Sequence, residues 1–242
     1  AYIIKKADTE VFFNMDYIKI TGGKPLCGSL RVQGSKNAVL PSLAATILNK
    51  GTTVLHNCPN LSDVKVTLEI LKFLGCKIKR ENDTVTVDAS VITNNYIPNE
   101  LMNKMRSSII FMGAIIARTG EASMSFPGGC ELGPRPIDLH LKALKTLGVE
   151  IEESHGYINC RLKKMQNKSV HLDFPSVGAT ENIMLFASLS NGKTTICNAA
   201  REPEIEDLQN FLNDMGAKIS GAGSSNIEIE GVESFHDCEH TV

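Results

Sequence analysis

The sequence predicts an α/β fold built from three copies of one structural unit, and a repeated pattern carries this prediction. Three segments, which begin at Gly51, Gly120 and Gly192, each read as a short alternating strand, a loop and an amphipathic helix. Similarity at a fixed period is typical of units that pack on one another and share one core. The three copies cover nearly the whole chain, so we predict one pseudo-threefold α/β domain.

The end of each copy gives a second, independent sign of the repeat. Each amphipathic helix is followed by a glycine, at Gly75, Gly148 and Gly216, the residue that most easily adopts the left-handed conformation after a helix. Two further β-segments follow the first and third helices. Asn82-Asp83 and residues 221–225 are the predicted hairpin turns between them.

A more apolar helix is predicted upstream of each copy, within residues 34–51, 99–120 and 175–192. These segments are rich in small and apolar residues all round, as a helix buried on most sides would be. With a leading strand, the predicted unit is therefore helix–strand–helix–strand–strand, about 70 residues long.

The second copy is enlarged at one loop. From its first to its closing glycine it is four residues longer than the other two, and the extra residues fall within "FPGGCELGPRP". A local insertion in one copy of a repeat tends to mark a functional loop. Cys130 lies inside it, which favours a functional thiol over an incidental one on a flexible loop.

The other cysteines are predicted to be structural. The chain has seven, an odd number with no CxxC pair, which argues against a disulfide framework and against a zinc site. Most lie in or beside apolar stretches, where cysteine acts as a small hydrophobic residue. A thiol redox sensor is a weak alternative, because no resolving cysteine lies close to Cys130 in sequence.

Composition excludes several classes of partner. The 242 residues carry a net charge of −2 with a pI near 6.3, and aromatic residues make up 5% with no Trp. Nucleic-acid binding and an anionic membrane partner are therefore not expected. No run approaches 18 consecutive apolar residues, and no signal peptide opens the chain, so we predict a soluble, cytoplasmic protein.

The start of the first helix in each copy is a candidate anion site. These starts carry Lys36-Asn37, then Lys104 and Arg106, then residues 176–178. Helix N-termini present unpaired N–H groups and a positive partial charge, which suit phosphates and carboxylates. Three related helix starts around a pseudo-axis would converge on one anionic ligand, although each basic residue alone is more typical of a solvated surface charge.

Five segments together resemble a known family. "GSKNAVLPSLAA", "MRSSIIFMGAIIAR", "PGGCELGPRPIDLHL", "PSVGATENIM" and "NAAREPEIEDL" are similar to the UDP-N-acetylglucosamine 1-carboxyvinyltransferases, which are enolpyruvyl transferases. The resemblance runs from about Met15 to Val242. It implies an inside-out α/β barrel domain of three βαβαββ-type repeats, in agreement with the repeat found above.

The resemblance also implies a division of the chain. Residues 36–242 would form the catalytic-loop domain, and residues 15–35 would supply N-terminal strands that in the family join a second domain. Residues 1–14 have no counterpart and are expected to be an extension. About two-fifths of a typical family member would be missing, including its general-base aspartate. We therefore expect the chain alone to lack turnover, and an isolated domain that only binds nucleotide sugar is the competing hypothesis.

The implied reaction uses no metal or organic cofactor. An enolpyruvyl group passes from phosphoenolpyruvate to the 3′-hydroxyl of UDP-N-acetylglucosamine, the first committed step of peptidoglycan precursor synthesis. By resemblance, Cys130 is the proton donor and the site of a phosphoenolpyruvate adduct and of fosfomycin alkylation. Lys36 and Arg135 would bind phosphoenolpyruvate, Asn37 would lie between the substrates, and Arg106 would share the anionic pocket.

Two further segments would line the binding site of the sugar nucleotide. These are Arg135, Pro136, Ile137, Asp138 and Leu139 in one, and Ser176, Val177 and Gly178 in the other. Many family members have Lys-Val just before the second segment, where this chain has Phe174-Pro175, so a contact of that lysine with the diphosphate is in doubt. For His140, which follows inside a helix, packing and ligand contact are equally consistent with the sequence.

Overall fold

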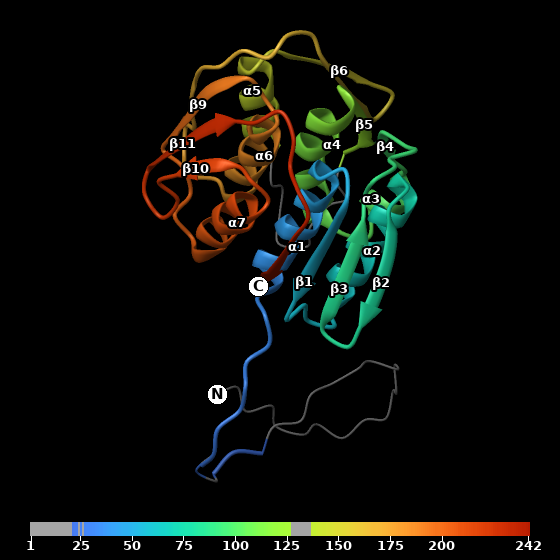
Figure 1. Cartoon of the computed structure of the whole chain (residues 1–242), viewed down its shortest axis with the longest axis vertical. Coiled ribbons are helices and arrows are strands. Elements are labelled where there is room, and N and C mark those ends of the chain that lie inside the picture. The colour runs from blue at the N-terminus through green and yellow to red at the C-terminus, as the bar shows by residue number, and fades with distance from the viewer. Residues whose placement is uncertain (1–20, 24, 26, 127–136) are drawn as a thin grey trace, which may run out of the picture. The chain divides into compact units, whose positions relative to one another are not determined.

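Three four-stranded sheets, one for each predicted unit, surround a set of central helices (Figure 1). The computed structural model describes residues 21–23, 25, 27–126 and 137–242. Ala1–Val32 and Gln33–Val242 are separate units, and the fold below is that of the second. The described part of residues 15–35 holds no strand, and the assignment of these residues to a second domain stays a prediction.

The three sheets repeat one strand order. In spatial order, the first sheet contains β12 (Cys238–Thr241), β1 (Thr52–His56), β3 (Thr84–Asp88) and β2 (Lys77–Glu81). The second sheet contains β4 (Tyr96–Ile97), β5 (Glu121–Ser125), β7 (Tyr157–Leu162) and β6 (Val149–Ser154). The third sheet contains β8 (Ser169–His171), β9 (Gly192–Cys197), β11 (Asn226–Gly231) and β10 (Lys218–Ser220). In each, the leading strand pairs parallel with the next, which is antiparallel to the third. The predicted repeat is therefore present in the topology.

The helices fall into two sets. The first set is α1 (Lys36–Ala45) with the 3-10 turn η1 (Thr46–Leu48), α3 (Asn99–Met102), the 3-10 turn η2 (Arg106–Ile110), α4 (Phe111–Thr119) and α6 (Val177–Ser188). The second set is α2 (Ser62–Leu74), α5 (Asp138–Thr146) and α7 (Pro203–Asp214). Residues 38–45 of α1, 111–116 of α4 and 179–188 of α6 are all buried, while α2, α5 and α7 bury one face.

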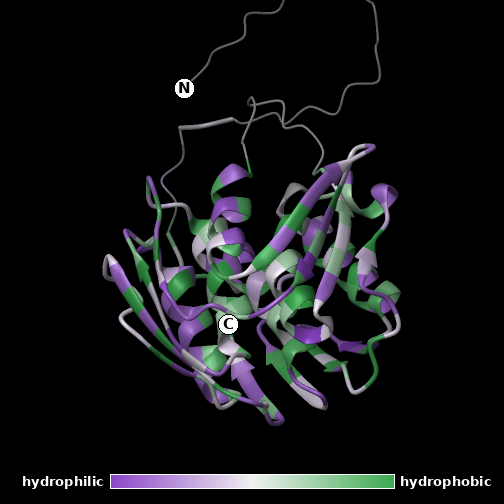
Figure 2. Ribbon diagram, turned by 90° about the horizontal axis from the view of Figure 1, so that it is seen from above, coloured by the Kyte–Doolittle hydropathy of each residue, from purple (hydrophilic) through white to green (hydrophobic). Residues whose placement is uncertain are grey.

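The sheets cover these helices and turn one face to solvent. Burial alternates along strands such as β3 and β11, and Figure 2 shows the matching alternation of hydrophilic and hydrophobic residues. The inward residues of all three sheets join one hydrophobic core with the helices. Helices inside and sheets outside are the layers that an inside-out α/β barrel requires.

The local turn chemistry follows the prediction. Gly75, Gly148 and Gly216 all have φ near +100°, in the left-handed region, just after α2, α5 and α7. Asn82 also has a positive φ, and with Asp83 it joins β2 to β3. Glycine adopts this backbone conformation without strain and asparagine does so more readily than most residues, which explains why these two residue types occupy the four positions.

The predicted helix within residues 99–120 is wrong as a single element. The structure breaks it into α3, η2 and α4. Met105 has an extended backbone (φ −148°) and is 4% exposed, and its Sδ lies 3.6 Å from Thr67 Oγ1. Burying this side chain against α2 favours the break over a continuous helix.

The leading strand of the first sheet comes from the far end of the chain. β12 pairs parallel with β1, with Thr53 opposite Cys238. His240, on β12, is anchored to α7, since its Nδ1 lies 2.8 Å from Asp214 Oδ2 and its Nε2 3.3 Å from Asp207 Oδ1. Burial of the ring opposes its charged form. The hydrogen bonds and charges of Asp207 and Asp214 outweigh burial, so the pKa of His240 lies above its usual value.

We expect this anchor to make the stability of the chain depend on pH. A histidine with a raised folded-state pKa contributes its full stabilisation below the unfolded pKa of about 6.5 and loses it as the pH rises through the folded value. The His240→Gln variant should therefore lose most stability relative to the wild type at pH 6, and less at pH 9. Urea denaturation at both pH values measures this, and an equal difference at the two would contradict it.

Candidate functional site

Lys36 opens α1 and is paired across the first unit. Its Nζ donates to Asp63 Oδ2 at 2.9 Å, and the side chains of Lys36 and Asp63 are 47% and 29% exposed. Asn37, the next residue, is exposed. An ammonium group, a helix N-terminus and an amide thus lie together and accessible, which suits an anionic ligand.

Asp63 is a residue that the sequence reasoning missed. It lies in the first turn of α2, 12 residues before Gly75, and Glu204 lies at the same distance before Gly216 in the third unit. Aligning the sequences of the first and third units at their closing glycines gives this match. It is a weak signal, because acidic residues in the first turn commonly just complement the helix dipole.

The second predicted segment begins α5. Ile137 precedes the helix and is partly buried against the core, Asp138 is its first residue and exposed, and Leu139 is 6% exposed. Asp138 is thus directed away from the core while its neighbours fix the start of the helix. Cys130, Arg135 and Pro136 lie outside the described residues, and their roles stay predictions.

The third predicted segment begins α6. Ser176 caps the helix, its Oγ accepting from Ala179 N at 3.4 Å, and its carbonyl accepts from Thr180 Oγ1 at 2.8 Å. Gly178 touches His140 of α5, because a Cβ on Gly178 would lie 3.0 Å from His140 Cε1. The structure therefore brings this segment next to the one that begins at Asp138.

The first helices of the three units are in contact. η2 packs against both α1 and α6, and α4 also contacts both. Arg106 is the first residue of η2. Lys104, another member of the predicted set, is half-exposed and donates to Glu69 of α2 at 2.9 Å, as a surface ion pair does. The first helices of the three units are therefore packed together, and convergence of their starts on one ligand stays a prediction.

Glu181 is the strongly perturbed carboxyl group near these segments. It follows Ser176–Gly178 in α6 and is only 6% exposed. Burial, and then the charges of Glu204 and Glu202, raise its pKa well above the usual value. No cation forms an ion pair with it among the residues that the structure describes. Burial at this position therefore disfavours the charged form of the carboxyl group.

Three of the described cysteines, Cys58, Cys76 and Cys160, are buried, and Cys197 and Cys238 are half-buried. Burial raises the pKa of the Cys58, Cys76 and Cys160 thiols to about 12 and that of Cys238 to about 11. The thiolate is the reactive form of cysteine, and burial disfavours it at these four positions. Cys27 is exposed.

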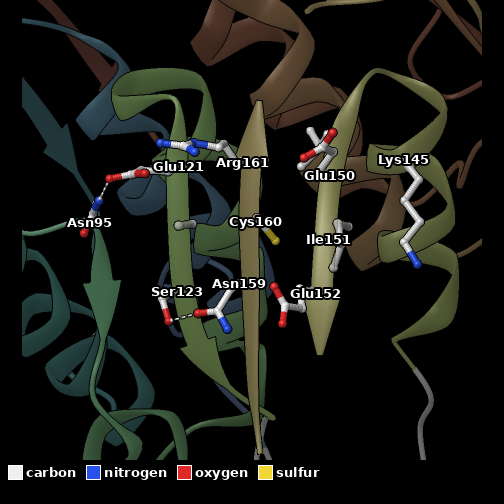
Figure 3. A pocket seen from close by; sticks show the side chains of 12 residues that line it. Asn95, Glu121, Ser123, Lys145, Glu150, Ile151, Glu152, Asn159, Cys160 and Arg161 are labelled. Carbon is white, nitrogen blue, oxygen red and sulfur yellow. Dashed lines mark hydrogen bonds between the residues drawn. The ribbon is translucent and has the colours of Figure 1, made fainter. Parts of the chain in front are cut away.

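A hollow on the second sheet holds none of the predicted residues. It measures about 830 Å³ and is lined by β5, β6 and β7, with Lys145 of α5 (Figure 3). Ser123 Oγ donates to Asn159 Oδ1 and Asn95 Nδ2 to Glu121 Oε1, both at 2.7 Å. Ser123 and Asn159 form a cross-strand pair, whereas Asn95 precedes β4, and neither contact forms a catalytic pattern.

The described residues limit other kinds of site. Residues 21–23, 25, 27–126 and 137–242 contain no cluster of His, Cys, Asp and Glu suited to hold a metal ion. None of the helices described is both long and apolar enough to cross a membrane.

Comparison with known proteins finds similarity to members of one protein family. The family model described as EPSP synthase (3-phosphoshikimate 1-carboxyvinyltransferase) matches residues 20–242. A protein of Caldanaerobacter subterraneus named UDP-N-acetylglucosamine 1-carboxyvinyltransferase 2 is 59% identical over 94% of this chain and 55% of its own length. A protein of Carboxydothermus hydrogenoformans named UDP-N-acetylglucosamine 1-carboxyvinyltransferase 1 is 48% identical over 94% of the chain and 54% of its own length. The chain thus spans about half the length of the curated relatives it matches.

Solved structures agree on the fold. The enolpyruvyl transferase NikO from Streptomyces tendae superposes with a TM-score of 0.80 at 24% identity, over 91% of this chain and 53% of its own. An EPSP synthase from Acinetobacter baumannii gives a TM-score of 0.70 at 19% identity, over 89% of this chain and 49% of its own. The predicted fold class is confirmed.

Proposed function

Because the chain belongs to the EPSP synthase family of enolpyruvyl transferases, we propose that the protein it forms transfers the enolpyruvyl group of phosphoenolpyruvate to the 3′-hydroxyl of UDP-N-acetylglucosamine. This is the first committed, cytoplasmic step of peptidoglycan precursor synthesis, on which cell shape and division depend. The observation that carries the proposal is the 59% identity to a UDP-N-acetylglucosamine 1-carboxyvinyltransferase over 94% of the chain. The motifs that hold the predicted site residues lie inside that matched region.

The proposed reaction assigns a task to each group. A proton from the Cys130 thiol adds to the methylene carbon of phosphoenolpyruvate, and the sugar hydroxyl oxygen forms a bond to the neighbouring carbon as its own proton leaves. Phosphate then departs while the new methyl group gives up a proton, which restores the double bond. A thiol serves as this acid when nearby positive charge lowers its pKa.

The remaining residues would bind and orient the two substrates. Lys36 and Arg135 neutralise the phosphate and carboxylate of phosphoenolpyruvate, in a pocket shared with Arg106, and Asn37 lies between the substrates. Such charged donors also stabilise the negative charge that develops in the transition state. Arg135–Leu139 and Ser176–Gly178 would hold the uridine diphosphate sugar, since backbone N–H groups at the starts of α5 and α6 suit a diphosphate.

Covalent labelling by fosfomycin tests this proposal on the chain itself. A thiolate opens the epoxide ring of fosfomycin to form a thioether, so intact-mass analysis counts the reactive cysteines. We expect a single adduct that requires UDP-N-acetylglucosamine. The buried Cys58, Cys76 and Cys160 should not react, because their thiols stay protonated.

Two variants control the labelling. The adduct should disappear in Cys130→Ala and persist in Cys27→Ala, which removes an exposed thiol. Labelling that survives in Cys130→Ala would overturn the proposal. The proposal would also be overturned if the wild-type chain were not labelled either with or without UDP-N-acetylglucosamine.

Lys36→Met should separate binding from stability. A charge-assisted hydrogen bond contributes about 1.5–3 kcal/mol, so we expect phosphoenolpyruvate affinity to fall at least tenfold. The ion pair with Asp63 is half-exposed, so the free energy of unfolding should change by less than about 1 kcal/mol. Isothermal titration and urea denaturation measure the two, with the exposed Lys65→Met as the matched control. Equal affinities for the two variants would contradict the assignment.

A further inference from the structure

A buried hydrogen-bond network links the helices that carry the predicted substrate segments. Asn182 of α6, which is fully buried, places its side-chain amide between partners on three other elements, and its Nδ2 also lies 3.4 Å from Gly178 O of its own helix. Its Oδ1 accepts from Gly113 N at 2.7 Å, and its Nδ2 donates to Ile109 O at 3.1 Å and lies 2.8 Å from His140 Nδ1. One amide thus joins η2, α4, α5 and α6.

The contact with η2 and α4 is built into the backbone. Ile109 and Gly113 are four residues apart, the spacing at which a continuous α-helix would join them directly. Instead, the Asn182 amide binds both, where η2 gives way to α4. A Cβ on Gly113 would overlap the carbonyl oxygen of Asn182, so glycine permits this approach of two helices.

The network also fixes the state of the histidine. A backbone N–H can only donate, so the Asn182 atom that faces Gly113 must be the oxygen, and the one that faces His140 must be the nitrogen. His140 Nδ1 is then an acceptor. The buried ring is therefore held as the neutral tautomer with its hydrogen on Nε2.

The other edge of the ring faces the first turn of α6. A Cβ on Gly178 would lie 3.0 Å from His140 Cε1 and 3.3 Å from Nε2, so the imidazole packs directly on this backbone. His140 itself lies two residues after Asp138 in α5. One side chain therefore connects the segment that starts at Asp138 to the segment Ser176–Gly178.

We infer that His140 is a positioning residue for a uridine diphosphate sugar, and that its hydrogen bond from Asn182 sets the spacing between the starts of α5 and α6. This inference rests on the proposed function. A diphosphate held by N–H groups from two helix starts is sensitive to their separation, because a charged hydrogen bond weakens quickly with distance. Neither His140 nor Asn182 is assigned contact with the substrate.

Two substitutions at one position test the role of the hydrogen bond. His140→Asn keeps an acceptor close to the place of Nδ1, while His140→Gln moves the polar group to the place of Nε2. We expect His140→Gln to weaken UDP-N-acetylglucosamine binding about tenfold, since a buried hydrogen bond contributes about that factor, and His140→Asn by less than about threefold. Isothermal titration of the full chain gives both values.

A matched control separates positioning from general destabilisation. Ser188→Ala removes a buried hydrogen bond to Met184 O at the far end of α6, so it should lower stability and leave affinity unchanged. In wild-type protein at pH 8, the nitrogen chemical shifts of His140 should report an Nε2–H tautomer. Equal affinities for His140→Gln and His140→Asn, or an Nδ1–H tautomer, would overturn the inference alone. A wild-type chain that fails to bind UDP-N-acetylglucosamine would overturn the proposed function and this inference with it.

Discussion

Gly113→Ala should destabilise the chain by about 2–3 kcal/mol. Replacing a helical glycine by alanine usually stabilises a protein by about 0.5–1 kcal/mol, so the expected sign is the reverse of the usual one. The reason is that the added Cβ would overlap the carbonyl oxygen of Asn182 and lie 2.9 Å from its Oδ1. The backbones of α4 and α6 would have to separate, and overpacking of this kind costs about 1–3 kcal/mol or more.

A substitution to alanine at an exposed helix position gives the comparison. Lys72→Ala, in α2, should change the free energy of unfolding by less than about 1 kcal/mol, as surface substitutions generally do. Urea denaturation of both variants measures the difference. If Gly113→Ala were as stable as the wild type, α4 and α6 would not be packed as closely as described.

Glu181→Gln should stabilise the chain at pH 8. Burial and the charges of Glu204 and Glu202 raise the pKa of Glu181 in the folded state, so the folded chain binds more protons than the unfolded chain above pH 4.3 or so. Stability is therefore lost as the pH rises from the unfolded pKa towards the folded one. Glutamine keeps the shape and removes this loss.

The pH dependence is the decisive part of that result. We expect the gain at pH 8 to exceed the scatter of about 0.5 kcal/mol seen for surface substitutions, and to shrink at pH 4, where the glutamate is largely protonated in both states. Glu206→Gln, at an exposed position of α7, should show no such change. A Glu181→Gln variant less stable than the wild type at pH 8 would instead indicate a functional ion pair at this carboxylate.

Local features of the fold were predictable from sequence because their causes are local. The left-handed glycines after α2, α5 and α7 and the turn at Asn82-Asp83 each follow from the conformation that their own residues favour. The three-unit organisation was also predictable, because each helix and strand keeps its own periodicity.

Long-range features were not predictable, because their causes lie in distant parts of the chain. Nothing in the residues of β12 indicates that it pairs with β1, about 185 positions away, because strand periodicity identifies no partner. The break after α3 likewise depends on Met105 meeting Thr67 of α2. Tertiary packing outweighs helix propensity there.

The candidate site likewise has local features that were predictable from sequence and long-range contacts that were not. The sequence indicated Lys36 and Ser176 as helix starts, and the structure has both at those places. It did not indicate Asp63 as the partner of Lys36, or Asn182 as the partner of His140, since each pair joins separate segments. Such partners become visible only when the units are packed together.

The most direct test of the proposed function is which acceptor the chain binds. Isothermal titration should compare UDP-N-acetylglucosamine with shikimate 3-phosphate, because the family includes enzymes named for both kinds of substrate. We predict saturable binding of UDP-N-acetylglucosamine and none of shikimate 3-phosphate at the same concentrations. Binding of shikimate 3-phosphate in preference to the nucleotide sugar would contradict the proposed function.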